Sequence, residues 1–176
     1  MIIDKLVQIG DEQLKKKLLQ VANFKDLELV ELVRDLIDTL YKHELVGIAS
    51  NRIGGRYRVF VTEVRRTKFR NPVKVDKVRV YINPMLVYES NEKEEVFEGC
   101  GSVAYSKLFA PVLRSKVIKV KAQDITGEEF TLEADGLLAR VIQHEIDHLN
   151  NIEFLEKVTD WSRALSSEEY RKYSQN

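Results

Sequence analysis

Two histidines and a glutamate stand close together in the segment HEIDH. His144 and His148 are four residues apart, so on a helix both imidazoles leave the same face and can bind one metal ion. Glu145 would lie beside the ion, where a carboxylate can take a proton from water and deliver it to a leaving group. Because two of the chain's three histidines fall in this spacing on an otherwise apolar stretch, we favour a hydrolytic metal site over a pair of core histidines.

A hydrolytic metal site of this kind uses three protein ligands and leaves one position open. Cys100 is one candidate for the third ligand, because the glycines around it in VFEGCGSV let backbone come close to a ligand. Glu168 and Glu169 are the other candidates, at a distance compatible with a gluzincin-type endopeptidase. The residue types alone leave this choice open. The third histidine, His43, is interpreted as a surface residue.

The composition predicts one compact domain over residues 1–176, with 44% hydrophobic and 32% charged residues. The 28 basic and 28 acidic residues cancel, which disfavours specific nucleic-acid binding and attraction to an anionic membrane. A single cysteine cannot form an intramolecular disulfide and fits a reducing compartment. No apolar run reaches signal-peptide length or the about 18 residues of a membrane span. We therefore expect a cytoplasmic protein that does not span a membrane.

The first half of the chain alternates between helical and extended patterns. Apolar residues recur at three- and four-residue spacing from Asp26 to Tyr41, which predicts an amphipathic helix. The other expectations here are a short helix, a glycine-punctuated connection, two strands and a solvated basic loop. The short helix is expected over Glu12 to Val21 and the connection over Val46 to Gly55. The strands are expected over Tyr57 to Val64 and Val78 to Asn83, with the basic loop, Arg65 to Arg79, between them.

The second half carries a predicted hairpin and the helix of the HEIDH segment. Lys116 to Ile125 and Glu128 to Ala134 flank Thr126-Gly127, a two-residue break typical of a β-hairpin. Asp135 is a plausible N-cap for a helix to about Leu149, whose apolar residues wrap much of its circumference. Ser166 and Glu169 have capping-box spacing before a short terminal helix. The fold class expected is α+β, with antiparallel strands wrapped around the central helix that carries HEIDH.

Three segments resemble, in order and separation, the motifs of the peptide deformylase family. They are VGIASNRIG (Val46 to Gly54), EGCGS (Glu98 to Ser102) and HEIDHL (His144 to Leu149). The similarity continues through YINP (Tyr81 to Pro84) and DGLLARVIQHEIDHLN (Asp135 to Asn150), so it covers most of the chain. HExxH alone is moderately specific, whereas the three motifs together are a strong signal.

The resemblance implies removal of the N-terminal formyl group from the methionine of nascent polypeptides. Its metal ligands would be Cys100, His144 and His148, holding one divalent ion that is Fe²⁺ in the cell and replaceable by Zn²⁺, Ni²⁺ or Co²⁺. Glu145 would be the general base and acid, and the backbone N–H of Gly101 would point at the oxyanion. The implied partners are formyl-Met peptide N-termini and, transiently, the ribosome.

The resemblance also suggests where the peptide would bind. Val46 and Gly47 would pair with the substrate backbone as an added strand. Leu137 and Val141 are candidates for the wall that receives the methionine side chain, with simple core packing as the alternative reading of both.

The chain departs from the family pattern at four informative positions. Leu45 stands where the family has glycine, Ser50 where it has alanine and Gly101 where it usually has leucine. Arg52 stands where the family has a glutamine that donates a hydrogen bond to the formyl oxygen, so it either replaces that donor, pairs with Glu145, or leaves the activity reduced. The alternative functions are a catalytically weak or inactive deformylase-like peptide-binding protein and, less favoured, the gluzincin-type endopeptidase.

Overall fold

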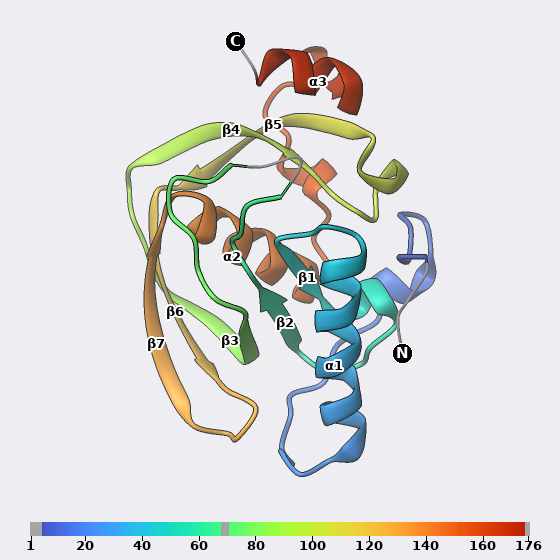
Figure 1. Ribbon diagram of the computed structural model, residues 1–176, viewed down its shortest axis with the longest axis vertical. Helices are drawn as coiled ribbons and strands as arrows, with labels where there is room; N and C mark the ends of the chain where they lie inside the picture. The colour runs from blue at the N-terminus through green and yellow to red at the C-terminus, as the bar shows by residue number, and fades with distance from the viewer. Residues whose placement is uncertain (1–4, 68–70, 175–176) are drawn as a thin grey trace.

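The structure is a computed structural model that describes residues 5–67 and 71–174. In this part of the chain, antiparallel strands curve around a central helix, α2, as Figure 1 shows. The helices are α1 (Leu27–Lys42), α2 (Gly136–Leu149) and α3 (Ser167–Tyr173). The predicted α+β fold, with HEIDH on the central helix, is confirmed.

The strands of the described residues form two sheets in which all neighbours are antiparallel. The larger sheet has the order β1-β2-β3-β6-β7, with bounds Gly47–Ala49, Val59–Thr62, Arg79–Glu89, Val117–Gln123 and Glu129–Asp135. The smaller sheet has the order β4-β5-β8, with bounds Lys93–Gly99, Leu108–Ser115 and Leu165–Ser166. Register shifts within the β3–β6 pairing bend the larger sheet, which lets it enclose α2.

Strand β2 is buried on both faces because helices lie on either side of it. Phe60 packs in one core cluster with Ile142 and Ile146 of α2. Val59 and Val61 point the other way, into a second cluster with the apolar face of α1. The consecutive apolar residues Val59, Phe60 and Val61 are the pattern expected of a strand buried on both faces.

The predicted helix from Glu12 to Val21 is wrong. Only Glu12–Lys15 forms a 3₁₀ turn. Beyond it the backbone of Leu19 is extended and hydrogen-bonds to the segment before β2. Leu19 N donates to Arg56 O (2.8 Å), and Leu19 O accepts from Arg58 N (2.8 Å). Leu14, Leu18 and Val21 are buried, so their helical spacing reflects burial in a segment whose backbone bonds elsewhere.

The predicted connection from Val46 to Gly55 contains a strand, β1, followed by a 3₁₀ turn over Ser50–Ile53. A β-carbon at Gly47 would lie 2.5 Å from Val141 Cγ1, so the small residues that suggested a loop are those that let β1 approach α2. Gly54, at φ +83°, ends the turn in a conformation that favours glycine.

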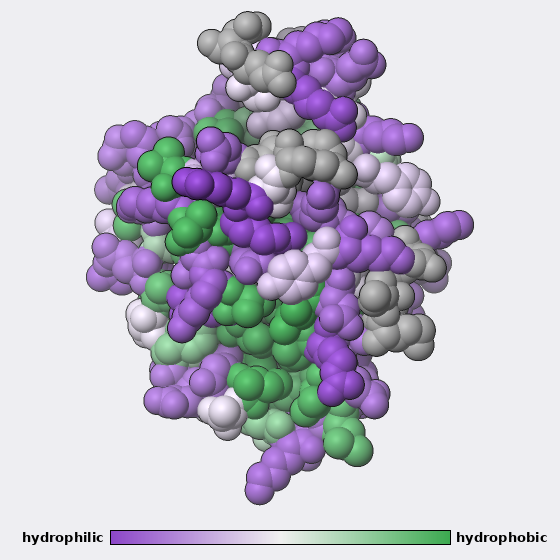
Figure 2. Space-filling model, in the orientation of Figure 1, coloured by the Kyte–Doolittle hydropathy of each residue, from purple (hydrophilic) through white to green (hydrophobic). Residues whose placement is uncertain are grey.

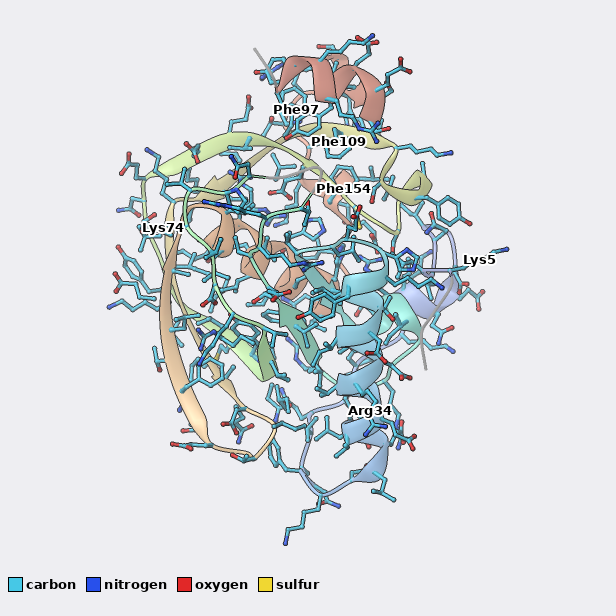
Figure 3. All side chains as sticks on the ribbon, in the orientation of Figure 1. Lys5, Arg34, Lys74, Phe97, Phe109 and Phe154 are labelled. Carbon is cyan, nitrogen blue, oxygen red and sulfur yellow. The ribbon has the colours of Figure 1, made fainter. Side chains whose placement is uncertain are left out.

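The hairpin of β6 and β7 is confirmed, but its connection is longer than the two residues predicted. It runs from Asp124 to Glu128, and Asp124 Oδ1 accepts hydrogen bonds from Thr126 N (2.8 Å) and Glu128 N (3.1 Å). Asp135 precedes α2 as predicted, but its side chain does not cap the helix. Instead it forms an ion pair with Lys74 (2.6 Å), which is labelled in Figure 3.

The basic segment from Arg65 to Arg79 is irregular as predicted until β3 begins at Arg79; its residues 68–70 lie outside the described residues. The strand predicted from Val78 to Asn83 continues to Glu89. Figure 2 shows polar side chains over most of one face and an apolar group between α1 and the larger sheet. Within the described residues, no helix has the length and apolar character needed to cross a membrane.

The helix α3 begins after Ser166, whose side chain accepts a hydrogen bond from Glu169 N (3.2 Å), one of the two bonds of the predicted capping box. Tyr170 of α3 stacks on Phe109 with ring centroids 4.2 Å apart, and Tyr173 lies 5.1 Å from Phe97. Figure 3 shows both phenylalanines beneath α3. The helix therefore covers β4 and β5.

Candidate metal centre and active site

Helix α2 and the end of β4 bring three metal-ligating side chains together. The ligand atoms of Cys100, His144 and His148 all lie within 4.8 Å of one another. His148 Nε2 is 2.9 Å from His144 Nε2 and 3.4 Å from Cys100 Sγ. The two histidines are one helical turn apart, and Cys100 immediately follows β4. The three residues that the resemblance implied as ligands therefore lie together in the structure.

The outer nitrogens of both histidines already have partners, which leaves the Nε2 atoms for an ion. His144 Nδ1 lies 3.0 Å from Glu98 Oε2, and His148 Nδ1 lies 3.3 Å from Ile152 O. The Glu98 carboxylate fixes the proton at Nδ1 of His144 and directs the Nε2 lone pair of that ring inward, whereas Nδ1 of His148 lies near both the Ile152 carbonyl and the guanidinium of Arg52. One thiol and two such imidazoles fit a divalent transition-metal ion.

Glu98, which the sequence analysis did not assign a role, anchors His144 within a buried charged network. Its carboxylate accepts from Arg114 Nε (2.6 Å), Arg140 Nη1 (2.7 Å) and His144. Burial alone would raise the pKa of Glu98, but the hydrogen bonds from His144 and Arg114 outweigh it and hold that pKa well below its ordinary value. Arg114 also pairs with Asp147 of α2 (2.7 Å), so the network ties β4, β5 and α2 together.

Electrostatics around His144 favour a cation at this place. Burial by itself lowers the pKa of His144, yet hydrogen bonds to Cys100 and Glu98 raise it to about 10. The thiol and the carboxylate beside His144 therefore stabilise positive charge at this place, where a divalent ion would compete with a proton on the imidazole.

The carboxyl of Glu145 lies beside Gly47 of β1. The residue is 4% exposed, and its Oε2 is buried without a hydrogen-bond partner in the described part of the chain. Burial raises the pKa of Glu145 above its ordinary value, and a backbone hydrogen bond from Ala49 opposes the shift. A β-carbon at Gly47 would come within 2.8 Å of Glu145 Oε1, so the glycine makes room for this carboxylate. A buried carboxyl with one free oxygen suits a group that exchanges protons with a reactant.

The carboxylate that pairs with Arg52 is Glu153. Arg52 is 2% exposed, and its Nη1 and Nη2 lie 3.1 Å and 2.9 Å from the two oxygens of Glu153. Arg52 Nη2 also contacts His148 Nδ1. Sequence reasoning named Arg52 but missed Glu153, although a buried guanidinium requires a carboxylate partner somewhere in the fold.

Gly101 lies in the turn that follows Cys100, and neighbouring leucines fill the space beside it. A β-carbon at Gly101 would lie 2.6 Å from Leu6 Cδ1 and 3.9 Å from Leu45 Cδ2. Leu45 and Gly101 are thus neighbours, and each is a position where the chain departs from the family pattern. The packing that a leucine at position 101 would supply comes instead from Leu45 and Leu6.

The candidate substrate-binding residues fall into two places. Val46 and Gly47 are at β1, the edge strand of the larger sheet, where Val46 O accepts from Glu63 N and Gly47 pairs with Thr62. Val141 packs under Gly47. Leu137 instead lines a cavity of about 630 Å³ between the start of α2 and the loop over residues 72–76.

Glu168 and Glu169 do not join the metal-ligating cluster. Both lie on α3, with side chains 80% and 56% exposed, and both pair with Lys172. The third member of the cluster is Cys100, so the endopeptidase reading, which requires that thiol to be free, gains no support.

Comparisons with known proteins identify the family of this chain. The family described as Polypeptide deformylase matches residues 3–164. The peptide deformylase of Natranaerobius thermophilus is 37% identical over 95% of this chain and 99% of its own length, and peptide deformylase 1 of Clostridium perfringens is 39% identical over 83% and 91%.

Solved structures of peptide deformylases have the same fold as this chain. The peptide deformylase of Thermotoga maritima has a TM-score of 0.77 at 33% identity, covering 89% of this chain and 97% of that one. A Met-Ala-Ser-bound class I type b peptide deformylase from Acinetobacter baumannii has a TM-score of 0.83 at 28% identity, covering 90% and 100%. The chain therefore belongs to the peptide deformylase family.

Proposed function

We propose that this chain removes the formyl group from the N-terminal methionine of nascent polypeptides by hydrolysing the formamide bond. The observation that carries the proposal is the convergence of Cys100 Sγ with the Nε2 atoms of His144 and His148, one residue from the buried carboxyl of Glu145. The Met-Ala-Ser peptide bound to the Acinetobacter baumannii relative is what such a reaction leaves behind, and it supports a peptide as the substrate here.

Cys100, His144 and His148 would hold one divalent ion, which we propose is Fe²⁺ in the cell, with Zn²⁺, Ni²⁺ or Co²⁺ able to replace it. When bound, the ion supplies Lewis-acid chemistry for the formyl carbonyl and the attacking water. Glu98 and Ile152 O keep the two imidazoles in the orientation that the ion needs.

Glu145 is the proposed proton carrier. Its carboxylate takes a proton from the attacking water and delivers it to the nitrogen that leaves as the new N-terminus. Burial favours the protonated form of Glu145 more than water would, so the group holds the proton between these two steps without a large energetic penalty.

The developing oxyanion has two candidate donors. The first is the backbone N–H of Gly101, which needs no side chain and lies in the turn that carries Cys100. The second is Arg52, which is engaged with Glu153. We propose that Gly101 is the resident donor and that Arg52 contributes only when it leaves Glu153.

The peptide would extend the larger sheet. Gly47 begins its edge strand β1 and Val46 directly precedes it, so we propose that outward backbone groups here pair with an added strand. Leu137 lines a cavity of a size that accepts an apolar side chain, and we propose that it forms part of the methionine pocket. Val141 contributes by holding β1 close, through its contact with Gly47.

Nascent chains are the source of formylated N-termini, so we propose a cytoplasmic enzyme that meets the ribosome transiently. The thiol of Cys100 is buried and unpaired, which fits a reducing compartment.

The experiment that tests the function is an anaerobic assay of the Fe²⁺-loaded protein on formyl-Met-Ala-Ser, with formate and the free peptide amine measured together. We expect stoichiometric release of both. The Glu145→Gln protein, loaded in the same way, is the control. Metal retention and peptide binding without formate release would instead indicate a catalytically weak peptide-binding protein. The Arg52–Glu153 ion pair favours this alternative, because it engages the side chain that stands at the position of the family's oxyanion donor.

A further inference from the structure

The turn that carries Cys100 and Gly101 contains unusual backbone. Ala104, Tyr105 and Ser106 all have positive φ, at 47°, 53° and 61°. Residues with side chains rarely adopt this left-handed conformation, and three in succession persist only when their surroundings hold them. The surroundings of this turn therefore determine its shape.

The N-terminal segment Leu6–Ile9 is the neighbour that holds the turn, and Figure 1 shows the first described residues, in blue, beside the connection between β4 and β5. The side chain of Gln8 spans the turn. Its Nε2 donates to Gly101 O (2.9 Å), and its Oε1 accepts from Tyr105 N (3.2 Å). A second bond from Nε2 to Leu6 O (3.1 Å) fixes the amide itself.

Backbone hydrogen bonds tie the same segment to both motifs of the site. Ile9 N donates to Ser102 O (2.8 Å), and Val7 N donates to Arg52 O (2.9 Å). Leu6 is 7% exposed and fills the space beside Gly101. The segment thus links the turn of Cys100 to the turn of Arg52 from outside the sheets.

Gly101 needs such support more than another residue would. Without a side chain its backbone has the widest conformational freedom, so its N–H has no fixed direction of its own. An oxyanion donor is effective only when it is held in position before the reaction, and small displacements cost rate.

We propose that Gln8 is a positioning residue for catalysis: through Gly101 O and Tyr105 N it holds the turn that presents the Gly101 N–H to the reacting carbonyl. The inference rests on the proposed deformylase function and on the role proposed there for Gly101. It assigns Gln8 no contact with substrate or metal.

The test compares Gln8→Ala with Gln13→Ala in the full-length Co²⁺-loaded protein. Gln13 is a matched control because its Nε2 also donates to a backbone carbonyl, Gly54 O (3.2 Å), in the neighbouring motif. We expect Gln8→Ala to lower kcat on formyl-Met-Ala-Ser by about tenfold to a hundredfold, with KM changed less than about twofold. Metal content should stay at the wild-type value, and Gln13→Ala should keep the wild-type kcat.

The absorption of Co²⁺ bound to a thiolate gives a readout that does not depend on turnover. We expect Gln8→Ala to alter the thiolate-to-cobalt band, because the turn that follows Cys100 loses a restraint, and Gln13→Ala to leave it unchanged. If Gln8→Ala is too unstable to purify, Gln8→Glu carries the same test, since it retains Oε1 and loses the donor to Gly101 O. Kinetics and spectra equal to those of Gln13→Ala would overturn the proposal. A wild-type protein that binds Co²⁺ but releases no formate would contradict the proposed function instead, while the spectral comparison still tests Gln8.

Discussion

His144 and His148 project from the same helix, one turn apart, but their outer nitrogens have contrasting surroundings. His144 Nδ1 faces the Glu98 carboxylate, which two arginines hold in a network that reaches two strands and the helix. His148 Nδ1 faces a carbonyl, Ile152 O, and also the guanidinium of Arg52, which only donates hydrogen bonds. The first histidine thus has an anionic partner, whereas the second shares its surroundings with a cation that Glu153 neutralises.

Under the proposed function, this contrast divides the site into a part that would hold the metal and a part that would contact the substrate. On the Glu98 side the charged groups pair with one another, Glu98 with Arg114 and Arg140, and Arg114 with Asp147, so we expect this half to fix the position of His144. On the Arg52 side a charged group occupies the position at which the family places an oxyanion donor. The two halves are therefore expected to fail differently when they are altered.

The largest effect is expected from Cys100→Ala, which removes the proposed thiol ligand and leaves only the two histidines. The site would keep two protein ligands on one helix, and we expect tight binding of the divalent ion to be lost while the fold survives. Metal content after gel filtration and a thermal unfolding curve would measure this. Ser102→Ala, a change to another buried residue of the same turn, is the control and should retain the ion. Full metal retention in Cys100→Ala would reject Cys100 as a ligand.

Glu145→Gln leaves both histidine surroundings intact and should remove only proton transfer. The amide cannot accept the proton of the attacking water, so we expect formate release to fall by about 10² to 10⁴ with metal content unchanged. Formate assays on protein of known metal content are the measurement. A variant that keeps most of its turnover would exclude Glu145 from the mechanism.

Glu98→Gln removes the anionic partner of His144. We expect metal affinity to fall by about 10- to 100-fold, because His144 loses the partner that orients it. The free energy of unfolding should also fall, by about 3–5 kcal/mol, because Arg114 and Arg140 lose a buried counter-charge. Glu153→Gln is the matched change on the other side and should alter metal affinity less. Equal losses of metal affinity in the two variants, measured by competition with a chelator, would show that the surroundings of His144 and His148 do not differ in this respect.

Arg52→Gln removes the cation beside His148 and restores the residue that the family has at this position. We expect kcat/KM on formyl-Met peptides to rise by about tenfold if a full oxyanion donor is regained. The single change leaves Glu153 without its partner, so Arg52→Gln with Glu153→Gln should be assayed alongside it. A decrease in kcat/KM in both proteins would show that Arg52 is itself the working donor.

The smallest effect is expected from changing Glu168 and Glu169 together to glutamine. Both side chains are exposed on α3, away from the cluster of Cys100, His144 and His148. Metal content and formate release should equal those of the wild type. Loss of the ion in this variant would revive the endopeptidase reading.

The sequence predicted those parts of the site that depend on local spacing. His144, Glu145 and His148 were identified because helical geometry relates residues four apart, and α1 and α2 were recognised by their apolar periodicity. Glu98 and Glu153 were missed as partners because the residues they contact, Arg114 and Arg52, are brought to them only by the tertiary fold. No periodicity marks such a pair.

Extended segments were the other source of error. Strand β1 has three residues, too few for an alternating pattern, and its Gly47 is set by the approach of α2 rather than by strand propensity. Gln8 and Leu6 lie in an irregular segment, and what singles them out is their contact with Gly101, which is distant in the sequence. Residues of this kind can be predicted only once the two motifs they connect have been placed.

The central position of α2 has a consequence for the order in which the protein is synthesised. Strands β1 to β7 all precede α2 in the chain, so each leaves the ribosome before the helix that fills the hollow they enclose. The growing chain therefore carries Cys100 and most of both sheets without their shared core, and it lacks both histidines. We expect the nascent protein to gain its fold and its metal affinity together, in one late step, once residue 149 has emerged.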